Sequence, residues 1–226
     1  MKLQERSYNG KFTRPRPEIY IEEQASLVII ATPWGVRSGA RRAIQTITDF
    51  YLSAMNDIEV TSPFQKLTCL SPTANSLRAS IMLANDVVSQ EENRNEYLSG
   101  LEIFVAARAG QEFSFIQLGF PQVFLDRQDA DVITTGCLTD LSLDFGPKRN
   151  SYPPLPNSLL GIHSTTSPTI RTLRLLENDR LLLVSHSWIP SEFFKLTRAQ
   201  RTLGGLSSSF STNVPDEPFW VGILEF

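Results

Sequence analysis

The spacing of apolar residues changes once along this chain, and that change constrains the fold more than any other feature. Up to residue 88, apolar residues recur at three- and four-residue steps in two stretches, at about residues 38–57 and 71–90. From residue 101 onward the period is two. The first spacing puts apolar side chains on one face of a helix, and the second puts them on one face of a strand. The sequence therefore predicts two amphipathic helices followed by a run of strands.

Turn and cap residues support these boundaries. Ser38 is suited to cap the first helix, and Pro72 lies where the first turn of the second helix tolerates proline. An apolar run at residues 25–31 predicts a buried strand, which Pro33 and Gly35 would end. Further short strands are expected around residues 103–106, 113–118, 123–125, 132–135, 171–175, 180–185 and 219–226.

Short strands joined by polar turns favour antiparallel hairpins. The predicted fold is therefore α+β, with two antiparallel sheets flanked by helices, in a single domain of residues 1–226. Three segments are predicted to be irregular. Residues 1–18 read as a polar lead-in, residues 143–157 as a proline-rich loop, and residues 204–213 as a loop rich in serine and glycine.

Composition excludes several functional classes. No apolar run is long enough to span a membrane, and the first residues do not resemble a signal peptide, so a cytoplasmic protein is expected. The net charge is −3 and basic residues form no long block, so nucleic acid is not an expected partner. Arg37, Arg41 and Arg42 cluster near a helix start, either as a solvated face or as an anion site.

Several short motifs, in order, carry a family resemblance. Residues 177–183 read Glu-Asn-Asp-Arg-Leu-Leu-Leu, residues 159–161 Leu-Leu-Gly and residues 83–85 Leu-Ala-Asn. With the order of elements, these resemble the PP2C (PPM) family of Ser/Thr protein phosphatases, in its compact bacterial form, over nearly the whole chain. The resemblance implies a four-layer αββα sandwich. It also implies two manganese or magnesium ions that activate a water for attack on phosphoserine or phosphothreonine.

The same resemblance places unexpected residues at the chemical positions. Ala31 stands at the metal-bridging aspartate, Thr32 at the metal-binding glycine, and His186 at the aspartate of a Ser-Asp-Gly motif. Alanine offers no ligand, and the family's metals prefer carboxylate oxygens. The positions implied to form the altered cleft are Glu18, Ala31, Thr32, Phe120, His186, Ser187 and Glu217.

We therefore predict a catalytically inactive pseudophosphatase that is not an enzyme, binds no metal cofactor, and acts in signalling through a protein partner. Acidic residues remain only at the margins of this altered cleft. The sequence leaves open whether Glu18 holds a single metal ion together with Asp216 or Glu217. His186 is expected to be structural rather than a ligand or base, since no acidic partner lies at a fixed spacing from it.

Two alternatives remain. One is a divergent metal-dependent Ser/Thr phosphatase that recruits other acids, for which Asp126, Asp129, Asp131 and Asp144 are candidates, although turns are their ordinary place. The other is a small-molecule-sensing domain that uses the vacated cleft, for which nothing in the sequence selects a ligand.

Overall fold

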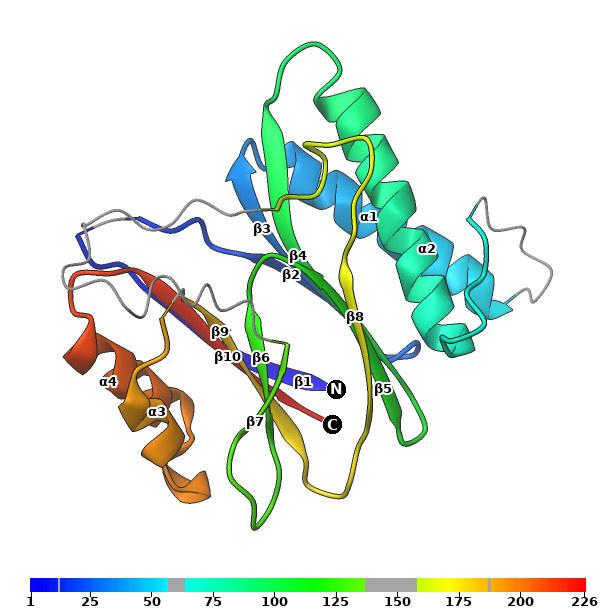
Figure 1. The fold of residues 1–226 in the computed structure, drawn as a ribbon. Coiled ribbons are helices and arrows are strands. Elements are labelled where there is room, and N and C mark those ends of the chain that lie inside the picture. The colour runs from blue at the N-terminus through cyan, green and yellow to red at the C-terminus, as the bar shows by residue number, and fades with distance from the viewer. Residues whose placement is uncertain (12, 57–63, 137–157, 187) are drawn as a thin grey trace. The chain divides into compact units, whose positions relative to one another are not determined.

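A computed structural model describes residues 1–11, 13–56, 64–136, 158–186 and 188–226. The chain divides into two compact units. The first unit comprises Met1–Arg16, Phe120–Pro156 and Leu176–Phe226. The second unit comprises Pro17–Gly119 and Asn157–Leu175. Each unit contains one five-stranded sheet and its own helices (Figure 1).

The second unit is built on a sheet with the strand order β2-β3-β4-β5-β8, in which every neighbouring pair is antiparallel. Its strands are β2 (Glu18–Glu22), β3 (Leu27–Gly35), β4 (Ser99–Ala109), β5 (Glu112–Leu118) and β8 (Thr169–Arg174). Its helices are α1 (Ser38–Asn56), α2 (Pro72–Val87) and the π-helical turn η1 (Val88–Glu92).

Helices α1 and α2 cover one face of this sheet because their apolar stripes match its apolar positions. Ile47 of α1 and Ile81 of α2 are fully buried in one cluster with Ile29, Ile103 and Val105. Helix α2 begins as predicted, with Pro72 in its first turn and the Ser71 hydroxyl accepting a hydrogen bond from the Ala74 amide at 3.2 Å. The predicted helices at about residues 38–57 and 71–90 are thus confirmed.

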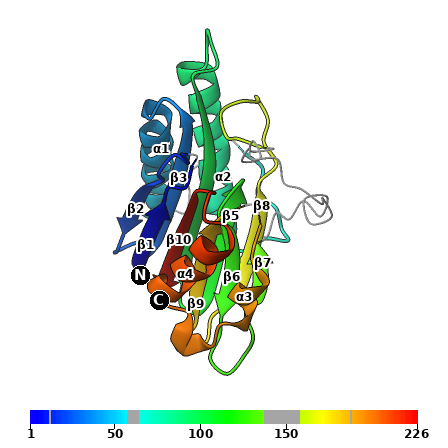
Figure 2. The same cartoon turned by 90° about the vertical axis from the view of Figure 1, so that its left-hand side faces the viewer.

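The first unit is built on a sheet with the strand order β1-β10-β9-β6-β7, again antiparallel throughout. Its strands are β1 (Lys2–Tyr8), β6 (Gln122–Asp126), β7 (Ile133–Gly136), β9 (Arg180–Ser185) and β10 (Phe219–Glu225). Its helices are α3 (Ser191–Lys195), the 3₁₀ turn η3 (Arg198–Gln200) and α4 (Leu203–Asn213) (Figure 2). Phe193 and Phe210 from these helices pack with Phe124, Val184 and Phe219 of the sheet region.

The predicted α+β class, with two antiparallel sheets and flanking helices, is confirmed. The predicted irregular lead-in at residues 1–18 is wrong in part, because Lys2–Tyr8 forms strand β1 along β10. Every residue of β1 is partly or fully exposed, so it shows no alternation of buried and polar positions. Its position at the edge of the sheet explains this polarity, since an edge strand has a partner on one side only.

The predicted loop at residues 204–213 is also wrong, because Leu203–Asn213 forms helix α4. The Thr202 hydroxyl caps it by accepting from the Gly205 amide at 3.2 Å, and Leu206 and Phe210 bury one face. Tertiary packing here outweighs the low helix propensity of glycine and serine. The predicted loop at residues 143–157 lies outside the described residues.

Candidate functional site

In the second unit, the predicted site residues lie on strands β2 and β3. Glu18 opens β2 and pairs in register with Ala31 of β3. Ala31 has no exposed surface and belongs to the core that α1 and α2 cover. Successive side chains of a strand point to opposite faces, so Thr32 lies on the other face of the sheet. The structure therefore places Glu18 and Ala31 on one face and Thr32 on the other.

Sequence reasoning missed a buried carboxylate on the Thr32 face. Glu102 of β4 pairs in register with Thr32 and is only 1% exposed. Gln117 of β5, 1% exposed, pairs with Phe104 two residues further along the same face. The sequence did carry a signal, because Glu102 is the one acidic residue in a run of apolar residues from Leu101 to Ala107.

Glu18 faces two positive charges, one from Arg37 just before helix α1 and one from Arg41 in its first turn. Its carboxylate lies 3.3 Å from Nη1 of Arg37 and 3.6 Å from Nε of Arg41. Both arginine side chains are more than half exposed, whereas the Glu18 side chain is 18% exposed. Arg42 instead pairs with Glu91 at 2.8 Å. The three arginines therefore form ion pairs along the helix, and two of them share one carboxylate.

In the first unit, His186 and Glu217 form a pair. Nε2 of His186 lies 2.8 Å from the Glu217 carboxylate, and the Trp188 amide donates to Nδ1 at 3.1 Å. The His186 side chain is 3% exposed, whereas that of Glu217 is 29% exposed. Glu217 is thus the acidic partner that sequence spacing alone did not reveal. The His186 imidazole, held at both ring nitrogens, positions the Glu217 carboxylate, which can accept a proton.

Strand pairing brings these two residues together. Ser185 at the end of β9 pairs in register with Trp220 of β10, so His186 follows one strand where Glu217 precedes the other. Gln122 fixes the His186 backbone, since its side-chain amide donates to the His186 carbonyl at 2.8 Å. Ser187, the remaining predicted position of this motif, lies outside the described residues.

Phe120 and Asp216 are also in the first unit. The guanidinium carbon of Arg14 lies 5.0 Å from the centroid of the Phe120 ring, a cation–π contact. Asp216 forms an exposed ion pair with Lys11 at 2.8 Å, and its carbonyl accepts from the Lys11 amide at 2.8 Å. A side chain at Gly10 would lie 2.2 Å from the Asp216 carbonyl oxygen, so only glycine fits this close approach.

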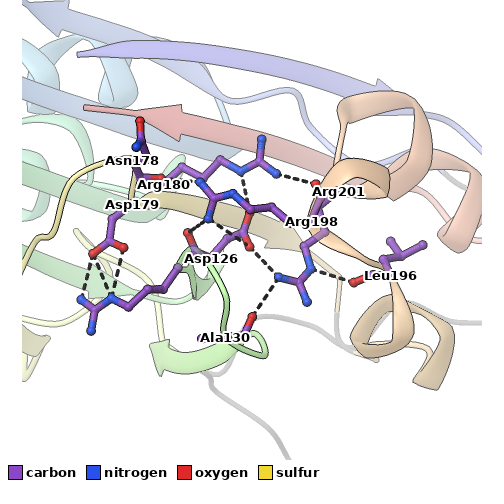
Figure 3. A network of polar contacts seen from close by, with 9 residues as sticks. Asp126, Ala130, Asn178, Asp179, Arg180, Leu196, Arg198 and Arg201 are labelled. Carbon is purple, nitrogen blue, oxygen red and sulfur yellow. Dashed lines mark hydrogen bonds and ion pairs between the residues drawn. The ribbon is translucent and has the colours of Figure 1, made fainter.

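Asp126, one acid considered for a divergent active site, is fully buried beneath arginines (Figure 3). Its carboxylate lies 2.5 Å from Nε of Arg180, 2.6 Å from Nη1 of Arg201 and 3.8 Å from Nη1 of Arg198. These bonds join β6 and β9 to the η3 turn and the residue after it. Asp129 and Asp131 are exposed in the β6–β7 turn, and Asp144 lies outside the described residues.

Asp179 sits beside this network and bonds Arg127 at 2.8 Å. Burial acts to raise the pKa of Asp179, but the hydrogen bonds from Arg127 and from the Leu176 amide outweigh it. The pKa of Asp179 therefore lies below its ordinary value, and the carboxylate is ionised at neutral pH.

The donor set of the described residues does not fit the metal pair that the resemblance implies. Within the described ranges, no group of three or more His, Cys, Asp and Glu side chains is placed to hold a metal ion. Glu18 already faces two arginines, and Glu217 faces His186. These carboxylates are therefore engaged by protein cations or an imidazole, and they do not form the bridging arrangement of a metal pair.

Comparison with solved structures shows which known fold this is. The chain matches the PPM Ser/Thr phosphatase MsPP from Mycobacterium smegmatis, solved with cacodylate, at a TM-score of 0.67 and 14% identity, covering 100% of this chain and 98% of that one. It matches PppA, described as a key regulatory component of the T6SS in Pseudomonas aeruginosa, at 0.63 and 16% identity, covering 100% and 97%. The catalytic domain of the phosphatase PstP, in complex with two manganese ions, matches at 0.63 and 18% identity, covering 99% and 97%. The fold is PP2C-like.

No family model matches the sequence, and no curated protein does. The PP2C-like likeness therefore rests on the arrangement of the backbone, at identities that show the fold alone. This confirms the PP2C-like fold that the motif resemblance implied.

Two predictions are corrected by the same comparison. The prediction that the chain is not an enzyme is wrong, because MsPP and PstP, two of the solved structures that share this fold, are Ser/Thr phosphatases. The prediction that no metal cofactor is used is also wrong, because PstP of the same fold is solved with two manganese ions. Both predictions rested on the set of substitutions at the chemical positions of the resemblance, among them Ala31, Thr32 and His186.

Proposed function

We propose that this protein is a divergent Ser/Thr protein phosphatase that acts on phosphoserine or phosphothreonine in proteins. The observation that carries the proposal is the PP2C-like fold, matched over the whole chain to Ser/Thr phosphatases. Fold likeness alone is an analogy, so the proposal also needs groups that can do the chemistry.

We also propose that residues 1–226 act as one PP2C-like domain in the cytoplasm. Among the helices of the described residues, none has the length and apolarity to cross a bilayer.

Glu217 and His186 are the groups proposed to handle protons. Glu217 is the partly exposed member of the pair, so its carboxylate is the one that can take a proton from a water. His186 is buried and has partners at both ring nitrogens, so it acts as a positioning residue. In this proposal Glu217 contacts solvent and transfers the proton, whereas His186 fixes the orientation of the Glu217 carboxylate.

Within the second unit, Arg37 and Arg41 are proposed to form an anion site that can bind phosphate. Their guanidinium groups are largely exposed and meet at the Glu18 carboxylate. Guanidinium groups recognise phosphate as well as carboxylate oxygens, so an incoming phosphate can replace Glu18 as their partner. Such a role develops the anion-site alternative that the sequence left open for this cluster.

The proposal is tested by phosphate release. Purified protein is incubated with a phosphothreonine peptide and with manganese, the ion found in PstP, and inorganic phosphate is measured against a blank without protein. The wild type is expected to release phosphate, and Glu217→Gln to lower kcat by about 10²-fold or more, as expected for loss of a proton-transfer group. Asp216→Asn is the matched control, because it removes a neighbouring carboxylate that pairs with Lys11 and is expected to leave kcat unchanged.

Release no faster than the blank with either manganese or magnesium would overturn the proposal. Equal losses in Glu217→Gln and Asp216→Asn would instead reject the role of Glu217 while leaving the phosphatase assignment standing.

A regulatory role through a protein partner is the second candidate. The observation that favours it is the match to PppA, a protein described as a regulatory component. Affinity capture with the wild-type chain from its native cells, followed by titration of each captured protein against the purified chain, tests this role. Failure of every captured protein to bind in the purified titration would reject it.

A further inference from the structure

A large polar cavity, open to solvent, lies within the second unit on residues that the proposed function does not use. Its volume is about 1070 Å³. One wall is the π-helical turn η1 and the residues after it, and the other is a segment at residues 162–165. π-Helical turns are frequent at functional sites, so the position of η1 in the wall favours a binding role for this cavity.

Two buried asparagines fix the walls of this cavity. The Asn93 side chain, 7% exposed overall, donates to the Gly161 carbonyl at 2.8 Å and accepts from the Ser99 amide at 2.9 Å. Asn85, 1% exposed, donates to the His163 carbonyl at 3.0 Å and accepts from the Gly161 amide at 2.9 Å. Both walls are therefore held in place before any ligand arrives, which lowers the entropy cost of binding.

Close packing beneath the cavity adds to this rigidity. Gly161 has a φ of +90°, and a side chain there would lie 2.3 Å from Cγ1 of Val88. Only glycine allows the segment at residues 162–165 to pass so close to the start of η1.

The side chains that line this rigid cavity include recognition groups without partners. Arg94, Tyr97 and His163 line it, and no hydrogen bond or ion pair engages their side chains within the described part of the chain. Tyr97 is 75% exposed, although it is a large aromatic residue. An unengaged guanidinium, phenol and imidazole in one cavity are the groups that proteins use to bind ligands.

The charges of this cavity favour an anion. Its acidic lining residue, Glu91, is neutralised by Arg42 at 2.8 Å. Arg94 is left as the unmatched charge, and Ser89, Ser164 and Thr165 add hydroxyl donors. Glu96 is on the same loop but is not one of the residues that line the cavity. A guanidinium beside several hydroxyls suits a phosphate monoester, which offers three acceptor oxygens.

The size of the cavity leaves room for a ligand larger than a free ion. Its volume of about 1070 Å³ lies just above the range of about 300–1,000 Å³ that is usual for small-molecule sites, and the cavity is open to solvent. Tyr97 provides an exposed ring for apolar contact beside the charged groups. We propose that this cavity binds a phosphorylated peptide segment, with the phosphate on Arg94 and a neighbouring side chain against Tyr97. The inference goes beyond the proposed function, because binding here requires no turnover.

The test is binding without catalysis. A fluorescein-labelled degenerate peptide library with a fixed central phosphothreonine is titrated with the full chain by anisotropy, in EDTA to prevent hydrolysis. The matched library carries threonine, and inorganic phosphate serves as a competitor. The phosphorylated library is expected to bind at least about tenfold more tightly than the unphosphorylated one, since charge-assisted hydrogen bonds are the stronger kind. Inorganic phosphate is expected to compete only at far higher concentration.

Variants locate the site. Arg94→Gln is expected to lower the affinity for the phosphorylated library about tenfold, and Tyr97→Ala to lower it about threefold or more. Arg171→Gln is the matched control, because it removes an exposed arginine of the same unit. Among the residues that the structure describes, this side chain bonds only the carbonyl of its neighbour Ile170. Equal affinity for the two libraries would overturn the proposal. So would inorganic phosphate binding as tightly as the peptides, or equal affinities of Arg94→Gln and Arg171→Gln at unchanged melting temperatures.

Discussion

Two sets of carboxylates in this molecule have opposite surroundings. The side chains of Asp126 and Asp179 have no exposed surface, and arginines bond them from β9, from the β6–β7 turn and from the residues around η3. Those of Glu18 and Glu217 are 18% and 29% exposed. A buried carboxylate cannot exchange its partners without leaving charges unpaired, whereas a partly exposed one can. The first set therefore holds the fold, and the second remains able to meet a ligand.

The largest effect is expected at Asp126. Asp126→Asn removes the charge that Arg180 and Arg201 share and leaves two largely buried guanidinium groups unmatched. Breaking a buried ion pair by removing one partner costs about 3–5 kcal/mol, so the free energy of unfolding should fall by that amount. Urea unfolding at pH 7 measures it, with Asp216→Asn as the exposed control. A loss of unfolding free energy below about 1 kcal/mol would mean that Asp126 contributes no more to stability than an exposed carboxylate such as Glu18.

A pH-dependent effect of intermediate size is expected at Asp179. Its pKa is lowered in the folded chain, so its carboxylate contributes stability above the pKa of the unfolded state, about 3.9. That contribution should disappear as the pH falls below this value towards the folded pKa. The urea midpoint of the wild type should therefore fall more steeply below about pH 4 than that of Asp179→Asn. Parallel curves for the two proteins would show that Arg127 and Asp179 are not coupled.

The helices and central strands could be predicted because a buried face requires apolar residues at regular spacing in the sequence. The stripe through Ile47 and the alternation through Ile103 survive because each element packs one face against the same core. Strand β1 and helix α4 could not be predicted in this way. Lys2–Tyr8 takes its structure from hydrogen bonds to β10, and Leu203–Asn213 takes its structure from two buried residues, Leu206 and Phe210.

The candidate site was less predictable than the fold, because its pairs depend on strand register. His186 meets Glu217 only because Ser185 lies opposite Trp220. Ala31 and Thr32 are neighbours in sequence, yet the pleat of β3 sends them to opposite faces. A motif match fixes which residues occupy a region, but a shift of one residue changes the face on which each side chain lies.

The smallest effect is expected at Glu18, and it tests whether the exposed set differs from the buried one. Glu18→Gln removes an ion pair whose two arginine partners are more than half exposed. Exposed ion pairs contribute about 0–1 kcal/mol to stability. The free energy of unfolding, measured with urea, should therefore change by less than about 1 kcal/mol. High salt should reduce the difference further, since it screens exposed charges. A loss as large as that of Asp126→Asn would mean that Glu18 is needed to hold Arg37 and Arg41 against β2. Their proposed exchange onto a phosphate within the second unit would then be too costly to occur.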